Sequence, residues 1–259
     1  MKSTKEERKQ EIYKVIAQHK LHIIKLKSHK DWPRVAETYK RMAQSYIIAQ
    51  EWDEALDALE RSCKIYEELN NKNELGSLYL TIGNIFYFKS QWRDSLKFHE
   101  KSLELKKELE DLAGIAKAYN NIGTVHAKLG HWEEALKWYS LSLEIKENLE
   151  DLAGKVVTYN NIALMFDLQG DWEKAHEFYN YSLQIQEALG DLLGMGQIWW
   201  RKGLLYSEQK KYSEALELME RSLAVKRSLG YSHLEEDEAV LASLRKKLAH
   251  ENSPFWRKF

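Results

Sequence analysis

The sequence repeats one pattern of side-chain sizes every forty residues. Small residues form one column of the repeat: Ala43, Gly83, Gly123, Ala163 and Gly203. Aromatic residues form a second: Trp52, Trp92, Trp132, Trp172 and Tyr212. Small residues form a third column: Ala55, Ser95, Ala135, Ala175 and Ala215. Serine forms a fourth column: Ser62, Ser102, Ser142, Ser182 and Ser222. Four columns in register over five units predict a repeat protein, in which each unit packs mainly against its neighbours.

Each unit carries two amphipathic helical patterns. In the third unit, one helical face is formed by Tyr119, Ile122, Gly123 and His126. After a turn at Gly130, the second pattern places further residues on one face: Trp132, Ala135, Leu136, Tyr139, Ser142 and Leu143. Small residues let two helices approach closely, and large residues fill the space on either side. We therefore expect the tryptophan column to lie in the core.

The boundaries of the predicted helices also recur. An Asp or Asn precedes each first helix: Asp31, Asn71, Asp111, Asp151 and Asp191. These side chains accept hydrogen bonds from free N–H groups of a first turn, and each such cap contributes about 1 kcal/mol. Gly130 and Gly170 stand where first helices end. Only 2 prolines and 12 glycines occur, which favours long helices.

These patterns predict an all-α solenoid of five helix pairs with a capping helix at each end. We expect one capping helix within residues 1–30, from about Glu6 to Lys27, and another within 231–251, from Ser232 to His250. The predicted units are 31–70, 71–110, 111–150, 151–190 and 191–230. Residues 252–259 are a tail, whose Phe255, Trp256 and Phe259 could pack back onto the end of the solenoid.

Composition and motifs exclude several classes of function. The net charge of −1, from 39 basic and 40 acidic residues, argues against general nucleic-acid binding. The chain has no long apolar run, so we expect no membrane span and a cytoplasmic location. We find no phosphate-binding loop and no metalloprotease motif. The one cysteine, Cys63, occupies an apolar column. We expect neither catalysis, nor a metal, nor a cofactor.

The third unit resembles a tetratricopeptide repeat. The matching residues are Tyr119, Ile122-Gly123, His126, Gly130-His131-Trp132 and Ala135. The usual period of that family is about 34 residues. The longer period and Tyr159-Asn160-Asn161-Ile162-Ala163 resemble kinesin light chains and spindle adaptors. Bacterial regulators of signalling peptides share the period. The resemblance implies a right-handed superhelix whose first helices line a concave groove that binds a protein or peptide.

Helical geometry selects the residues that face this groove. The core face of each first helix is known from the columns, so the opposite face is expected to be open. The residues on this open face form the candidate peptide-binding set: Lys40, Arg41, Asn84, Tyr87, Asn120, Asn121, Thr124, Asn160, Asn161, Leu164, Trp200 and Arg201.

Two features of this set favour binding. Asparagine is a poor helix former, and its amide suits the main chain of an extended peptide. Exposed aromatic and apolar residues are typical anchors of binding sites. Alternatives stay open at this point. The asparagines could only join neighbouring repeats, the aromatics could be covered by a terminal helix or a second copy, and the basic residues could be solvated.

Three classes of function follow. The first is a non-catalytic scaffold or adaptor that binds a peptide or partner segment in the groove. The second is a self-associating assembly module, so homo-oligomerisation stays open. The third is an enzyme or a small-molecule sensor, which requires convergent polar groups in a closed pocket. The sequence provides no such cluster. A sensor of a small signalling peptide is a further alternative to the adaptor.

Overall fold

The computed structural model describes residues 2–231 and 234–251, with the side chains of residues 2–6 and 8 left out. This part of the chain folds into twelve α-helices and contains no strand. The helices are α1 Lys2–Ser28, α2 Trp32–Ile48, α3 Trp52–Glu68, α4 Lys72–Phe88, α5 Trp92–Glu108, α6 Leu112–Lys128, α7 Trp132–Asn148, α8 Leu152–Gln169, α9 Trp172–Leu189, α10 Leu192–Glu208, α11 Tyr212–Ser228 and α12 Glu235–Glu251.

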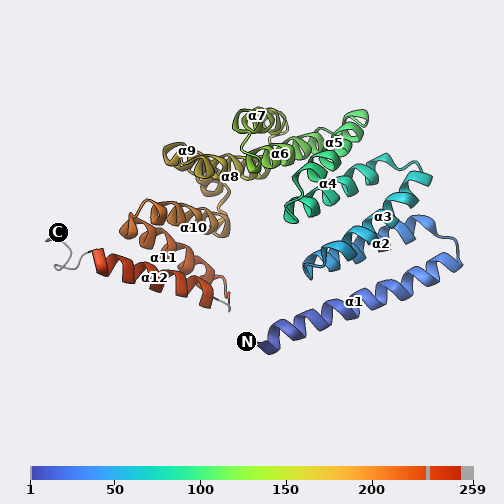
Figure 1. Ribbon diagram of the computed structural model, residues 1–259, viewed down its shortest axis with the longest axis horizontal. Coiled ribbons are helices and arrows are strands. Elements are labelled where there is room, and N and C mark those ends of the chain that lie inside the picture. The colour runs from blue at the N-terminus through green and yellow to red at the C-terminus, as the bar shows by residue number, and fades with distance from the viewer. Residues whose placement is uncertain (1, 232–233, 252–259) are drawn as a thin grey trace. The chain divides into compact units, whose positions relative to one another are not determined.

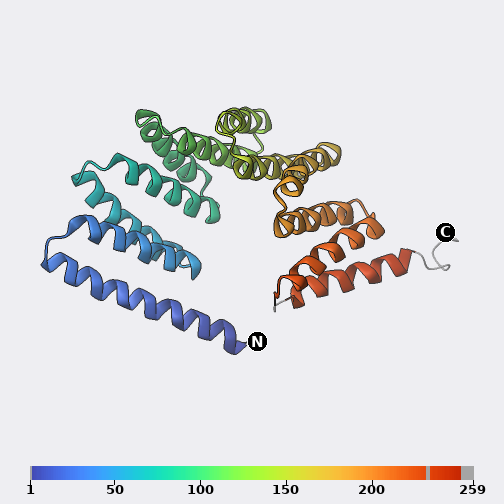
Figure 2. The ribbon, with the colours of Figure 1, turned by 180° about the vertical axis from the view of Figure 1, so that it is seen from behind.

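The chain divides into two compact units, Met1–Ile145 and Lys146–Phe259. In the first unit α1 to α5 pack successively side by side, and in the second α10, α11 and α12 do the same (Figures 1 and 2). Consecutive helix pairs of this kind are typical of a helical-repeat solenoid, so the predicted all-α class is confirmed. The tail, with Phe255, Trp256 and Phe259, lies outside the described residues.

All five predicted N-caps are confirmed. The caps of α2 and α4, Asp31 and Asn71, accept hydrogen bonds from backbone N–H groups three residues later. The caps of α6, α8 and α10 each accept one from a glycine N–H at 2.8–2.9 Å: Asp111, Asp151 and Asp191. These bonds satisfy donors that a helix start leaves free, and they fix where every first helix of a pair begins.

The helix ends were predicted less well. Gly130 and Gly170 adopt the expected left-handed conformation, with φ of 76° and 80°. Gly190 and Gly230 make the same turn, but at seven other helix ends it is made by residues other than glycine: Lys30, Gln50, Asn70, Ser90, Glu110, Glu150 and Lys210. The turn recurs because backbone bonds hold it, as where the Asp111 N–H bonds to the Lys106 carbonyl at 2.9 Å. Glycine is therefore an incomplete marker of these turns.

The small-residue columns lie at the helix crossings, as expected. Ala43, Ala55 and Ala135 have no exposed surface. The serine column adds a hydrogen bond between the helices of a pair, since Ser62 Oγ donates to the Ala36 carbonyl at 2.9 Å and Ser142 Oγ to that of Ala116 at 2.7 Å. These short side chains both permit close approach and satisfy a buried carbonyl.

The expectation that the tryptophan column lies in the core is wrong for Trp172 and only partly correct elsewhere, since half-buried Trp52 packs against the core. Trp172 is 41% exposed, and Trp52, Trp92 and Trp132 are half-buried. Each of these tryptophans is the first residue of a second helix, and the rings of Trp52 and Trp92 pack against aromatic residues at the end of α4. Trp52, for example, stacks on exposed Phe88 with ring centroids 5.5 Å apart. The core is instead formed by residues further along each helix.

Candidate functional site

The basic candidates of α2 are held in ion pairs. Lys40 Nζ lies 2.8 Å from Glu74 Oε2 on α4 and 3.3 Å from Glu37 Oε2. Arg41 Nε lies 3.0 Å from Glu37 Oε1. Burial by itself lowers the pKa of Lys40, but the hydrogen bonds and charges of Glu74 and Glu37 raise it overall. Lys40 thus joins two successive first helices.

The candidates of α4 and α6 form a polar chain within the first unit. Asn121 Nδ2 donates to Asn84 Oδ1 on α4 at 3.0 Å. Thr124 Oγ1 donates to the Asn120 carbonyl at 2.9 Å and accepts from the Tyr139 hydroxyl at 3.1 Å. The bond between Asn84 and Asn121 supports the alternative that these asparagines join neighbouring repeats.

Tyr87 lies beside this chain at the end of α4 and is half-buried. Its ring packs edge-on against Phe88 and Trp92, with centroids 5.8 and 5.2 Å away. Burial raises the pKa of Tyr87. The residue is therefore part of an aromatic cluster whose open member is Phe88, which is 63% exposed.

The residues of the column that contains Lys40 and Asn120 face the next helix pair. Asn120 is only 6% exposed. Leu80 packs against the α6 residues Ile115 and Ile122. Trp200 packs against the α11–α12 core, with Lys226 Nζ 5.1 Å from its ring centroid. Helical geometry placed this column on the groove, but its members lie mostly between successive first helices.

The second unit holds an open part of the predicted groove. We define the α8–α10 surface as Asn160, Asn161, Leu164, Asp167, Leu168, Arg201, Leu204 and Glu208. Leu168 and Leu204 are 50% and 44% exposed, and Arg201 is exposed. Asn161 and Leu164 are half-buried. The surface thus combines exposed apolar side chains with charged and amide groups.

Two acceptor atoms on this surface are buried and have no hydrogen-bond partner within the described residues. They are Oδ1 of Asn160 and Oδ1 of Asp167. The Asp167 carboxyl has a raised pKa because of burial first and then the negative charge of Glu208. Buried polar atoms are nearly always paired in native proteins. Neither atom is open to solvent in this structure, so a donor from a bound molecule reaches it only after the side chain turns outward.

Sequence reasoning missed one residue of this region, Tyr179 of α9, which is buried beneath the surface. Burial raises the pKa of its hydroxyl, while the nearby positive charge of Arg201 acts in the opposite sense. The signal was in the sequence, because tyrosine recurs at 139 and 179, and Tyr139 reaches Thr124 on α6.

No group of three or more His, Cys, Asp or Glu side chains that could hold a metal ion is found among residues 2–231 and 234–251. Cys63 is buried, as expected, and burial raises the pKa of its thiol to about 12. A thiol with so high a pKa is a poor nucleophile at neutral pH. None of the helices in this part of the chain is long and apolar enough to cross a membrane.

The repeats can be compared with those of known families. The tetratricopeptide repeat model matches residues 34–108, 114–188 and 157–228, which together cover well over half of the chain. The chain belongs to the tetratricopeptide repeat family. The tetratricopeptide resemblance that we drew from Tyr119 to Ala135 is thus confirmed. A search of curated proteins gave no match.

Several solved structures share the fold of this tetratricopeptide repeat chain. BtubC (BKLC) from P. vanneervenii has a TM-score of 0.69 at 17% identity, covering 86% of this chain and 93% of BtubC. The quorum sensor NprR from B. thuringiensis, in its apo form, has a TM-score of 0.68 at 18% identity, covering 90% and 65%. Apo RapI has a TM-score of 0.65 at 15% identity, covering 85% and 78%. At these identities the likeness concerns the fold alone.

Proposed function

We propose that this tetratricopeptide repeat protein is a non-catalytic adaptor that binds a peptide segment of another protein, with the α8–α10 surface as the principal contact. The observation that carries the proposal is the pair of exposed apolar side chains, Leu168 and Leu204, beside the exposed Arg201 and the half-buried polar side chains of Asn160 and Asp167. A peptide offers main-chain N–H donors and apolar side chains together, which meets both requirements.

The charges of this surface limit the kind of peptide segment that we expect it to bind. Asp167 and Glu208 repel each other, as the raised pKa of Asp167 reflects after the effect of burial. A Lys or Arg of the bound segment relieves that repulsion. We therefore expect a segment with one apolar anchor and at least one basic residue. In the first unit, Asn84, Asn121 and Thr124 are proposed as further contacts.

A sensor of a small signalling peptide is the second candidate function. Its specific support is that the same surface would suit a free peptide as well as a segment of a protein. NprR, whose fold is shared, is described as a quorum sensor. The two candidates are distinguished by what the chain retains from a cell extract, a protein or a short peptide.

The test is an affinity capture from the lysate of the source cell, read by mass spectrometry, followed by titration of the captured partner. The test variant carries Leu168→Lys and Leu204→Lys. Because two exposed apolar anchors are replaced by charges, we expect the affinity to fall by about tenfold or more.

The matched control carries Leu189→Lys and Leu229→Lys, which change leucines that are 50% and 49% exposed at the ends of α9 and α11. Circular dichroism first establishes that both variants fold. Equal loss of binding in the control, or retention in the test variant, contradicts the assignment of the α8–α10 surface.

A further inference from the structure

Two histidine rings lie side by side at the turn between α6 and α7, within the first unit. The Nδ1 atoms of His126 and His131 are 3.4 Å apart, and the ring centroids are 5.6 Å apart. His126 is half-buried near the end of α6, and His131 is exposed directly before α7 begins. The turn therefore brings two nitrogen atoms together at a place that solvent reaches.

The backbone of the turn holds the two histidines at this spacing. The His131 N–H donates to the His126 carbonyl at 3.0 Å, and Gly130 between them has a φ of 76°. The same bond recurs in other pairs, for example from the Gln91 N–H to the Phe86 carbonyl at 2.8 Å. The closeness of these two positions is thus a property of the repeat and does not depend on the histidine rings.

Among the five repeats, only the third has histidine at both positions. The column of His126 is otherwise aromatic: Tyr46, Phe86, Phe166 and Tyr206. The column of His131 otherwise holds Glu51, Gln91, Asp171 and Lys211. In the second pair, Phe86 stacks on Phe98 with ring centroids 5.4 Å apart. Packing at this position is therefore satisfied by a phenyl ring, and the imidazole nitrogens of the third repeat are available for another role.

The distance between the two nitrogen atoms fits a shared metal ion better than a hydrogen bond. A hydrogen bond from an N–H group usually spans about 2.7–3.2 Å, so the observed 3.4 Å is long for one. Zinc binds imidazole nitrogen at about 2.0–2.1 Å in tetrahedral geometry, which places two such ligands about 3.3–3.4 Å apart. The spacing of two zinc ligands is therefore present without any change in the backbone.

The charges around His126 suit a ligand of a divalent cation. Burial, and then the charge of His131, lower the pKa of His126. A lowered pKa keeps the ring neutral at neutral pH, and imidazole binds a metal through a nitrogen that carries no proton. The negative charges of Glu134 and Glu100 act on the pKa of His126 in the opposite sense. The same two charges attract a cation that is bound beside the ring.

We propose that His126 and His131 bind one Zn²⁺ ion through their Nδ1 atoms. Water completes the coordination shell, because two protein ligands leave positions open. The expectation of no metal rested on sequence motifs, which do not detect two ligands that a turn brings together. The site is independent of the α8–α10 surface and of the function proposed for it.

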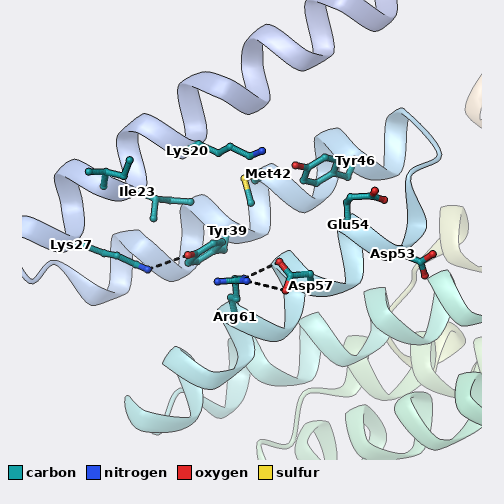
Figure 3. Close-up of a pocket in the computed structure, with 11 residues that line it drawn as sticks. Lys20, Ile23, Lys27, Tyr39, Met42, Tyr46, Asp53, Glu54, Asp57 and Arg61 are labelled. Atoms are coloured by element: carbon teal, nitrogen blue, oxygen red, sulfur yellow. Dashed lines mark hydrogen bonds and ion pairs between the residues drawn. The ribbon is translucent and has the colours of Figure 1, made fainter.

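A second group of possible cation ligands lies on α3, in the same unit. Asp53, Glu54 and Asp57 line a cavity of about 580 Å³ between α1, α2 and α3 (Figure 3). Asp57 is bonded to Arg61 at 2.8 and 3.1 Å, and Asp53 is paired with Lys89. A metal ion has to break these ion pairs in order to bind there, so this group serves as a control for nonspecific uptake.

Calorimetric titration of the chelator-treated chain with ZnCl₂ at pH 7 tests the proposal. Each ligand is replaced by the residue that the second repeat has at the same position, which gives His126→Phe and His131→Gln. Circular dichroism establishes that both variants fold. We expect each variant to bind Zn²⁺ about tenfold more weakly or worse, because the loss of an outer-shell partner alone already costs that much.

Two control variants change groups elsewhere in the first unit. His22→Gln removes an exposed histidine of α1 that lies three residues from His19, and Glu54→Gln removes a carboxylate of the α3 group. We expect both controls to bind Zn²⁺ like the wild type. Weakened binding in either control, or wild-type affinity in His126→Phe or His131→Gln, overturns the proposal.

Long-range ¹H–¹⁵N spectra of the histidine rings identify the coordinating atoms. On addition of Zn²⁺ we expect the Nδ1 signals of His126 and His131 to shift, while the signals of the other histidine rings stay in place. Histidine signals that do not change in a large excess of Zn²⁺, or a response confined to His19 and His22, overturn the proposal.

Discussion

Replacement of Gly123 by leucine is expected to lower the free energy of unfolding by about 3 kcal/mol, the upper end of the usual cost of overpacking. A Cβ atom at this position lies only 2.9 Å from Cδ1 of Tyr139 and 3.1 Å from the Ala135 carbonyl oxygen. The carbonyl belongs to the backbone of α7 and has little freedom to move, so a branched side chain must push the two helices apart. Urea denaturation followed by circular dichroism measures the change.

Two further variants serve as controls for this prediction. Lys117→Leu places the same side chain on an exposed position of the same helix, and we expect a change of no more than about 0.5 kcal/mol. Gly123→Ala is expected to cost less than leucine, because alanine occupies this column at 43 and 163. If Gly123→Leu is as stable as Lys117→Leu, α6 and α7 do not cross as closely at Gly123 as the structure shows.

Acidification from pH 6.5 to pH 4 is expected to lower the stability by about 3 kcal/mol through His99 alone. His99 is 1% exposed, its Nδ1 has no partner within the described residues, and burial lowers the pKa of its imidazole to about 4. The unfolded chain takes up the proton near pH 6.5, the usual value, whereas the folded chain does so only near pH 4. Between these values the unfolded state binds more protons, so stability falls as the pH falls.

His99→Leu tests this assignment, since Leu59 occupies the same column in the first pair. Urea denaturation is compared at pH 7 and pH 4.5 for the two proteins. The variant is expected to lose about half of the dependence that the two histidines produce together, because burial lowers the pKa of His176 to about 4 as well. An unchanged difference between pH 7 and pH 4.5 contradicts the role of His99.

The repeat and its caps were predictable because they depend on local chemistry. Asp151 marks a helix start through a bond to the Gly154 N–H, three residues away, and nothing distant alters it. Lys30 and Glu110 adopt left-handed turns that no sequence rule for glycine finds. Those turns are held by backbone hydrogen bonds across the helix end, such as that from the Asp111 N–H to the Lys106 carbonyl.

The candidate site was only partly predictable. A helical wheel separates the core face from the open face, but adjacent positions such as Lys40 and Arg41 are only about 100° apart. The structure shows that Lys40 bonds to Glu74 on the next first helix, while Arg41 is exposed. The stacking of helix pairs decides which of two neighbouring columns faces the next repeat. The pattern of a single helix carries no information about that stacking.

Trp172 illustrates a different reason for error. A repeated tryptophan was expected to be buried, yet this ring is 41% exposed, because the first residue of a second helix lies at the edge of the pair. The position of Trp172 along its helix affects its exposed fraction more than the size of its side chain does.

The most direct test of the proposed adaptor function is carbene footprinting of the chain with and without its captured partner. We predict that labelling of Leu168 and Leu204 falls severalfold on binding, while labelling of Leu189 and Leu229 is unchanged. That result assigns the partner to the first helices of the second unit. Protection confined to Leu189 and Leu229, with Leu168 and Leu204 labelled as before, contradicts the account.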